Sequence, residues 1–215
     1  MSGSSAGRVV RVCTTLAVIH SLLASKQVKN LIRRIAGPRY RNGLYRLAYN
    51  AQSVVFLTWA TWWFLRLPDR ELYQAKQPWS WLFRVGQAAS LGVLLSGVRV
   101  IGILDFAGVT RLRSLVSGLV PDPEPEAQGP PIGAYGELIT TGPFRFTRHP
   151  SNLGALGVFL LFPRMTVNRA VLAALVALYV VLGSLHEEHR LRAAYGNPFE
   201  RYREKVPFLV PRIWR

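Results

Sequence analysis

Five apolar runs, separated by polar segments that contain Gly and Pro, dominate the chain. They cover residues 9–25, 44–67, 81–106, 152–162 and 167–185. Apolar runs of about 17–25 residues can cross a bilayer as helices, whereas the fourth run would span only about 16 Å. The pattern predicts an all-α, polytopic protein with about five transmembrane helices. The fourth is either half of a tight hairpin or extends backward past Pro150.

The segments between the apolar runs predict how the chain is organised. Tryptophans flank the short loop 68–78 on both sides, which is typical of residues at a membrane interface. The Pro-rich loop 121–133 separates three N-terminal helices, in residues 1–120, from a C-terminal helical hairpin and tail, in residues 134–215. The last helix should continue beyond the membrane and stop near Gly196. A signal peptide is the alternative for the first run, but no clean small-residue cleavage site follows it.

Charge sharpens the membrane assignment. The chain has 27 Lys and Arg against 11 Asp and Glu, and ten of these basic residues precede Asp69, the first acidic one. Six of the ten fall in 26–43, which the pattern predicts to be a cytoplasmic loop because such loops are rich in Lys and Arg. For five crossings, the N-terminus is then outside and the C-terminus cytoplasmic. Nucleic-acid binding is disfavoured because the sequence contains no recognisable soluble binding module.

Metal sites and disulfides find little support in the sequence. Cys13 is the single cysteine, so neither an intramolecular disulfide nor a Cys-x-x-Cys zinc site can form. His186 and His189 are three residues apart, whereas the zinc-binding His-Glu-x-x-His motif places its histidines four apart. We therefore predict no metal.

One stretch carries specific chemistry. Gly142-Pro-Phe-Arg-Phe-Thr-Arg-His-Pro150 is followed by the pair Glu187-Glu188 and then by a tail that contains Gly196 and Tyr202. Over residues 134–211 this order resembles the integral-membrane methyltransferases related to isoprenylcysteine carboxyl methyltransferase, which include phospholipid and methanethiol methyltransferases. The resemblance implies S-adenosylmethionine as cofactor. It also implies an acceptor that is a small thiol, an isoprenylcysteine carboxylate or a lipid amine.

The resemblance also implies roles for individual residues. The expected catalytic residues are Arg148, His149 and Glu188, and the expected cofactor-binding residues are Gly142, Pro143, Arg145, Arg148, His149, Asn152, Gly154, Glu187, Glu188 and Tyr202. A guanidinium beside a helix start suits the cofactor carboxylate, and a glutamate suits its ammonium or a ribose hydroxyl. His149 could orient the cofactor or accept a proton. Asn152 departs from the tyrosine that many relatives have there, so an aromatic contact is lost.

The N-terminal half has a second resemblance, carried by His20-Ser-Leu-Leu-Ala-Ser25 and Tyr45-Arg-Leu-Ala-Tyr-Asn50. These segments are similar to the methanethiol methyltransferase and NnrU-like branch. In the NnrU-like relatives the corresponding histidine is associated with haem. A haem-binding membrane isomerase or redox-linked protein using His20 is therefore the alternative function. A relative that has lost activity and acts as a membrane scaffold is a third. Expected partners are the methyl acceptor and membrane lipids.

Overall fold

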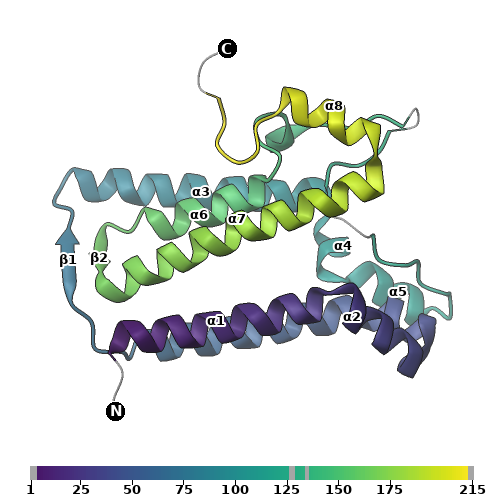
Figure 1. Ribbon diagram of the computed structural model, residues 1–215, viewed down its shortest axis with the longest axis horizontal. Helices are drawn as coiled ribbons and strands as arrows, with labels where there is room; N and C mark the ends of the chain where they lie inside the picture. Colours follow the sequence, from purple (N-terminus) through teal and green to yellow (C-terminus); the bar gives the residue numbers. More distant parts are fainter. Residues whose placement is uncertain (1–3, 126–128, 134–135, 213–215) are drawn as a thin grey trace. The chain divides into compact units, whose positions relative to one another are not determined.

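The computed structural model describes residues 4–125, 129–133 and 136–212, and its predominantly helical architecture confirms the predicted fold class (Figure 1). The chain divides into two compact units. Unit 1 contains residues 1–68 and 102–125, and unit 2 contains residues 69–101 and 126–215. The boundaries expected from the sequence, at 120 and 133, stay a prediction, and residues 126–128 of the Pro-rich loop lie outside the described residues.

Unit 1 is built from α1 (Ser5–Ala24), α2 (Lys26–Phe64), α4 (Ile103–Ala107) and α5 (Val109–Val116). The helices α1 and α2 lie side by side, joined by a turn at Ser25, whose side chain accepts a hydrogen bond from the Val28 N–H and so caps α2 (Figure 1).

The predicted loop at 26–43 is wrong, because these residues belong to α2. Apolar residues at positions 28, 31, 32 and 35 have helical spacing, which gives this basic segment one apolar face. A kink interrupts the helix at Gly37, where φ is 80°. That angle is open to glycine at little cost and allows Pro38 to follow.

A buried carboxylate joins the end of unit 1 to α2. Glu124 lies 2.7 Å from the Lys29 ammonium, 2.6 Å from the Arg46 guanidinium and 3.8 Å from that of Arg41. Burial alone would raise the pKa of Glu124, but hydrogen bonds and positive charge from Lys29 and Arg46 outweigh it and lower the pKa. This cluster therefore fastens residues near 124 against the basic helix.

The lowered pKa makes the stability of unit 1 depend on pH. Glu124 stabilises the folded chain fully above its usual pKa of 4.5, and that contribution is lost as the pH falls through the lowered value. Glu124→Gln should therefore reduce the thermal unfolding temperature near neutral pH, and the deficit should shrink in acid. Thermal scans in detergent across pH measure this, with exposed Asp122→Asn as control. A deficit that stays constant down to acid pH would contradict the assignment.

Unit 2 contains the long helices α3 (Trp79–Ile101) and α7 (Val167–Tyr195), with α6 (Pro150–Leu160) packed against both. The 3-10 turn η1 (Gly142–Arg145) precedes α6, and α8 (Asn197–Lys205) follows α7. Two short strands, β1 (Glu71–Gln74) and β2 (Arg164–Thr166), pair antiparallel, with Glu71 opposite Thr166 and Gln74 opposite Arg164. The loops 68–78 and 163–166 therefore meet at one end of unit 2.

Several helix boundaries differ from the sequence prediction. The third apolar run ends as α3 at Ile101, because Gly102 adopts a φ of 101°, and Asp105 belongs to the separate helix α4. The short helix α6 begins at Pro150, after His149 as its N-cap residue, and so does not extend backward. The predicted end of the last helix is confirmed, since α7 ends at Tyr195 before Gly196.

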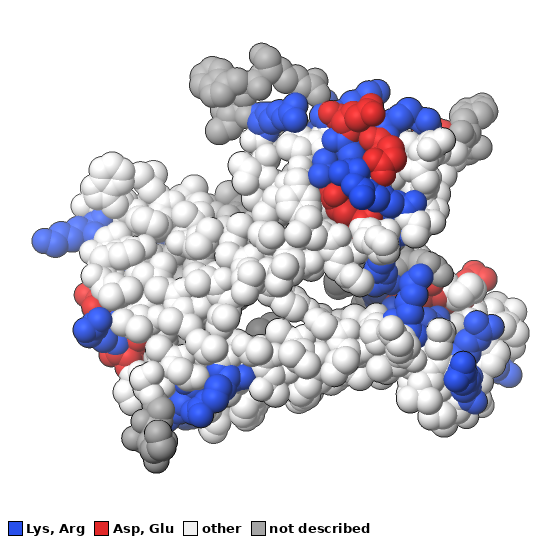
Figure 2. Space-filling model, viewed as in Figure 1, with Lys and Arg blue, Asp and Glu red and all other residues white. Residues whose placement is uncertain are grey.

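Within the described ranges, three helices are long and apolar enough to cross a membrane: α1, α3 and α7. Most of the run at 44–67 lies in α2, which ends at Phe64 and is not one of the three. Large apolar side chains of α3 are exposed, among them Trp81, Leu82, Val85, Leu91 and Leu95. On the face of unit 2 drawn in Figure 2, charged side chains gather near α8 and near the strands, with an almost uncharged surface between. Exposed apolar surface of this extent suits contact with lipid.

Close packing of α6 on α3 depends on Gly154. A Cβ at this position would lie 2.5 Å from the Leu94 nitrogen and 2.5 Å from the Ser90 carbonyl oxygen, both backbone atoms. We expect Gly154→Ala to destabilise the protein by about 1–3 kcal/mol through overpacking. Thermal unfolding in detergent measures this, with Gly183→Ala in α7 as control, because an added Cβ there meets nothing within 4 Å. Equal unfolding temperatures for the two variants would refute the close contact.

Candidate active site

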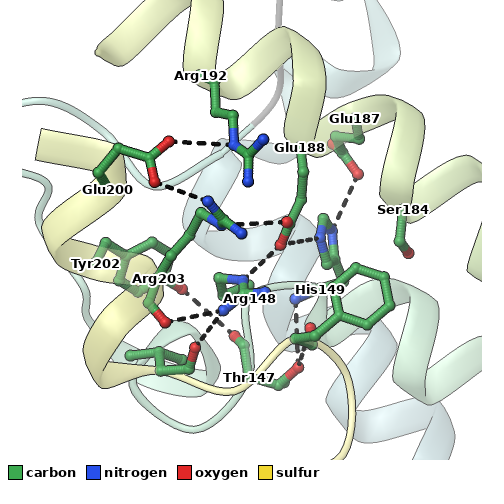
Figure 3. A network of polar contacts seen from close by, with 12 residues as sticks. Thr147, Arg148, His149, Ser184, Glu187, Glu188, Arg192, Glu200, Tyr202 and Arg203 are labelled. Atoms are coloured by element: carbon green, nitrogen blue, oxygen red, sulfur yellow. Dashed lines mark hydrogen bonds and ion pairs between the residues drawn. The ribbon is translucent and has the colours of Figure 1, made fainter. Parts of the chain in front are cut away.

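The residues that the sequence singled out converge where α6 begins and α7 approaches its end (Figure 3). Arg148 and His149 stand immediately before Pro150, whose missing N–H costs nothing in a first helical turn. Glu187 and Glu188 project from α7 toward them. Four of the predicted site residues are thus brought together from two segments about forty positions apart.

Glu188 is the centre of the cluster. One carboxylate oxygen accepts a hydrogen bond of 2.5 Å from Arg148 Nε and lies 3.5 Å from His149 Nε2. The other oxygen lies 3.4 Å from Arg203 Nε. The side chain is only 8% exposed, so its charge depends on these guanidinium groups for compensation.

Arg148 also holds the C-terminal segment in place. Its Nη1 donates to the carbonyl oxygens of Arg203, at 3.1 Å, and Val206, at 2.6 Å. Its backbone N–H donates to the Pro207 carbonyl at 3.0 Å. The guanidinium is therefore engaged by the protein itself, whereas the motif predicts a contact with the cofactor carboxylate.

His149 is a buried ring between two carboxylates. Its Nδ1 lies 3.3 Å from Glu187 Oε2, and the edge of the ring packs on Phe208, with ring centroids 5.2 Å apart. Among the described residues, the buried Nε2 atom has no hydrogen-bond partner. The Glu187 side chain is 31% exposed, so it links the buried imidazole to the accessible surface.

Tyr202 lies in the small apolar core that supports the cluster. It packs with Leu191, Phe199 and Val206, and its hydroxyl donates to the Phe144 carbonyl at 2.7 Å. Burial raises the pKa of Tyr202, the positive charge of Arg148 opposes this and the negative charge of Glu188 adds to it. The phenol is therefore a neutral donor that fixes η1 to α8.

The remaining predicted residues lie around this centre. Asn152 donates to the buried Ser184 hydroxyl at 2.8 Å, and Gly154 faces the backbone of α3. Gly142, Pro143 and Arg145 form η1, with the exposed Arg145 guanidinium over the Phe146 ring. Contacts with a cofactor stay a prediction for all of these residues.

The sequence did not predict two members of the cluster, Ser184 and Arg203. Ser184 precedes Glu188 by four positions and so shares its helix face, a signal that helical spacing offers. Arg203 also forms an ion pair of 2.7 Å with Glu200, which in turn lies 3.1 Å from Arg192. Only the fold connects Arg203 with Glu188, because the two belong to different helices.

The polar residues of unit 1 form local contacts. His20 Nε2 lies 2.6 Å from the Tyr49 hydroxyl, and its Nδ1 lies 3.3 Å from the Ser53 hydroxyl. Arg46 and Asn50 both donate to the Phe106 carbonyl in α4. A metal ligand role for His20 would require it to give up one of its two hydroxyl contacts.

Comparison with known proteins gives relatives that are all named methanethiol S-methyltransferase. The chain is 25% identical to a methanethiol S-methyltransferase of Pseudomonas deceptionensis over 213 residues, 96% of this chain and 72% of the relative. It is 27% identical to that of Crocosphaera subtropica over 203 residues, 92% and 71% of the two chains. Methanethiol S-methyltransferase 2 of Bradyrhizobium diazoefficiens is 35% identical over 71 residues, 33% of this chain and 27% of the relative.

No family profile and no solved structure gave a significant match. The relatives lend no support to the haem alternative. They do confirm the resemblance seen in the motifs, since two of them align with nearly the whole chain. The chain is therefore a methyltransferase related to the methanethiol S-methyltransferases.

Proposed function

We propose that the protein transfers a methyl group from S-adenosylmethionine to the sulfur of a small thiol. The observation that carries the proposal is the buried His149 ring, held between Glu187 and Glu188 with one nitrogen that has no hydrogen-bond partner among the described residues. The names of the relatives, which specify methanethiol, support the thiol as acceptor.

The residues present fit the cofactor. S-adenosylmethionine carries an ammonium and a sulfonium, and Glu187 is the partly exposed carboxylate of the cluster that could meet a cation or a ribose hydroxyl. The carboxylate of the cofactor suits the first turn of α6, where no side chain caps the helix amides. Arg148 instead keeps Glu188 and the C-terminal segment in place. When bound, the cofactor supplies a methyl group that is electrophilic because it is attached to a sulfonium.

The chain's own residues then activate and position the acceptor. A thiol has a pKa of about 8.5 or higher, so it must lose its proton to become a good nucleophile. The free Nε2 of His149 accepts this proton, and the resulting imidazolium lies between two carboxylates. The thiolate formed in this way would then take the methyl group that the bound cofactor supplies, while His149 holds the proton.

The same geometry favours a thiol over an acceptor that is already ionised. An isoprenylcysteine carboxylate has lost its proton near neutral pH and needs no base. A base at His149 therefore suits an acceptor that must lose a proton before it reacts.

The proposal includes a topology of five crossings with the N-terminus outside and the C-terminal tail cytoplasmic. Pairing of β1 with β2 supports it, because loops 68–78 and 163–166 share one side in this arrangement. The basic residues of 26–43 support it too, since Lys and Arg gather on the cytoplasmic side.

The test begins with purified protein in detergent, S-adenosylmethionine and three acceptors: methanethiol, a farnesylcysteine acid and an aminophospholipid. We expect dimethyl sulfide from methanethiol, detected by gas chromatography, and little product from the others. If only the farnesylcysteine acid or the aminophospholipid gave a product, a thiol would not be the acceptor. If no cofactor bound at all, the whole proposal would be wrong.

Glu187 provides a test of cofactor binding by calorimetry. Glu187→Gln should weaken binding of S-adenosylmethionine by about tenfold or more, because a hydrogen bond to a charged group is lost. The control is Glu204→Gln, which removes an exposed carboxylate from α8. Unchanged binding in Glu187→Gln would remove this residue from the cofactor site.

A further inference from the structure

The first part of α2 is a distinct segment. Residues 26–36 are separated from the rest of the helix by the kink at Gly37 and Pro38. They follow α1, a helix able to cross a membrane, with only Ser25 between them. If α1 crosses the bilayer, residues 26–36 begin where its hydrocarbon region ends.

This segment is amphipathic, with an exposed apolar edge. Val28 and Ile32 are partly buried, whereas Leu31 is 52% and Ile35 73% exposed. Arg33 and Arg34 are exposed beside this edge. A helix with one apolar and one basic face is the type that lies in the membrane interface.

The charges of Arg33 and Arg34 are not paired with a carboxylate among the described residues. Unit 1 has 12 Lys and Arg against three Asp and Glu, and one of these carboxylates, Glu124, is already engaged by Lys29, Arg41 and Arg46. Over the part of the chain that the structure describes, no carboxylate lies within 4 Å of Arg33 or Arg34. Figure 2 shows Lys and Arg side chains gathered near α5 and the first turns of α2.

A groove of about 420 Å³ lies at the kink, lined by Asn30, Arg33, Arg34 and Pro38. Two guanidinium groups and an amide are donors that match the oxygens of a phosphodiester. We propose that this groove binds the headgroup phosphate of an anionic glycerophospholipid, whose acyl chains lie against Leu31 and Ile35. The exposed apolar edge favours a lipid over a soluble anion, because only a lipid has acyl chains that can pack against this edge.

Native mass spectrometry of the full chain in detergent tests the site. The probes are phosphatidylglycerol and phosphatidylcholine of equal chain length, with inorganic phosphate as a competitor. We expect phosphatidylglycerol to bind more tightly than phosphatidylcholine, by about tenfold or more, since each basic residue near an anionic headgroup contributes. Arg33→Gln combined with Arg34→Gln should abolish this preference.

The matched control is Arg11→Gln combined with Arg84→Gln, which removes the same charge from exposed positions elsewhere. This control should keep the preference. Leu31→Ser with Ile35→Ser should weaken binding of both lipids and leave the preference for phosphatidylglycerol. A preference that survives in Arg33→Gln/Arg34→Gln, or that falls equally in the control, would overturn the site. Displacement of the lipid by millimolar phosphate would overturn the lipid as its ligand.

Discussion

His149→Gln is expected to lower kcat for thiol methylation by about 10²–10⁴-fold, the range that a positioned general base contributes. Glutamine keeps much of the volume of the buried ring but cannot accept a proton. Binding of S-adenosylmethionine should change little, because Glu187 and Glu188 remain. Initial rates of dimethyl sulfide formation, with calorimetry of the cofactor, separate the two effects. The loss should diminish at high pH, where more of the thiol is ionised without a base.

His186→Gln is the matched control, since His186 is exposed on the same helix as the two glutamates. It should retain the rate of the native chain. If His149→Gln also retained that rate, His149 would not be the base. If its activity were lost together with cofactor binding, His149 would position the cofactor instead.

Arg148→Ala is expected to destabilise the protein by about 3–5 kcal/mol, because it leaves the buried charge of Glu188 without its main partner. The variant also removes the donor for the Arg203 and Val206 carbonyls. We therefore expect a large fall in the thermal unfolding temperature, together with faster proteolysis of the segment after α8. Fluorescence-detected unfolding in detergent and limited trypsin digestion measure the two effects.

The ion pair of Arg192 with Glu200 supplies the contrast. Both side chains are about half exposed, at 46% and 48%, so Arg192→Ala should cost about 0–1 kcal/mol. Equal destabilisation by the two variants would mean that burial of Glu188 is not what makes Arg148 important.

Hydrophobic pattern predicts the long apolar helices well, because α1 and α7 are read from uninterrupted apolar runs. It fails for 26–43, where high charge suggested a loop although positions 28, 31, 32 and 35 already had helical spacing. It also missed the break at Gly102, since a glycine within an apolar run can stay helical. Local sequence therefore gives the element type better than its boundaries.

The candidate site, too, could be predicted only in part from the sequence. The motif located Arg148, His149, Glu187 and Glu188, and the structure brings these four together. It did not predict that Arg148 serves the protein, because a hydrogen bond to a backbone carbonyl does not depend on the type of the accepting residue. Contacts of this kind depend on tertiary packing, so a single sequence carries no local signal for them.

The bonds from Arg148 to residues 203–207 also have a consequence for biosynthesis. The helices α3 and α7, which are long and apolar enough to cross a membrane, are synthesised before α8. Glu188 receives both of its guanidinium partners only after α8 has emerged and folded back onto the start of α6. Assembly of the cluster around Glu188 is therefore a late event, which follows synthesis of the helices that support it.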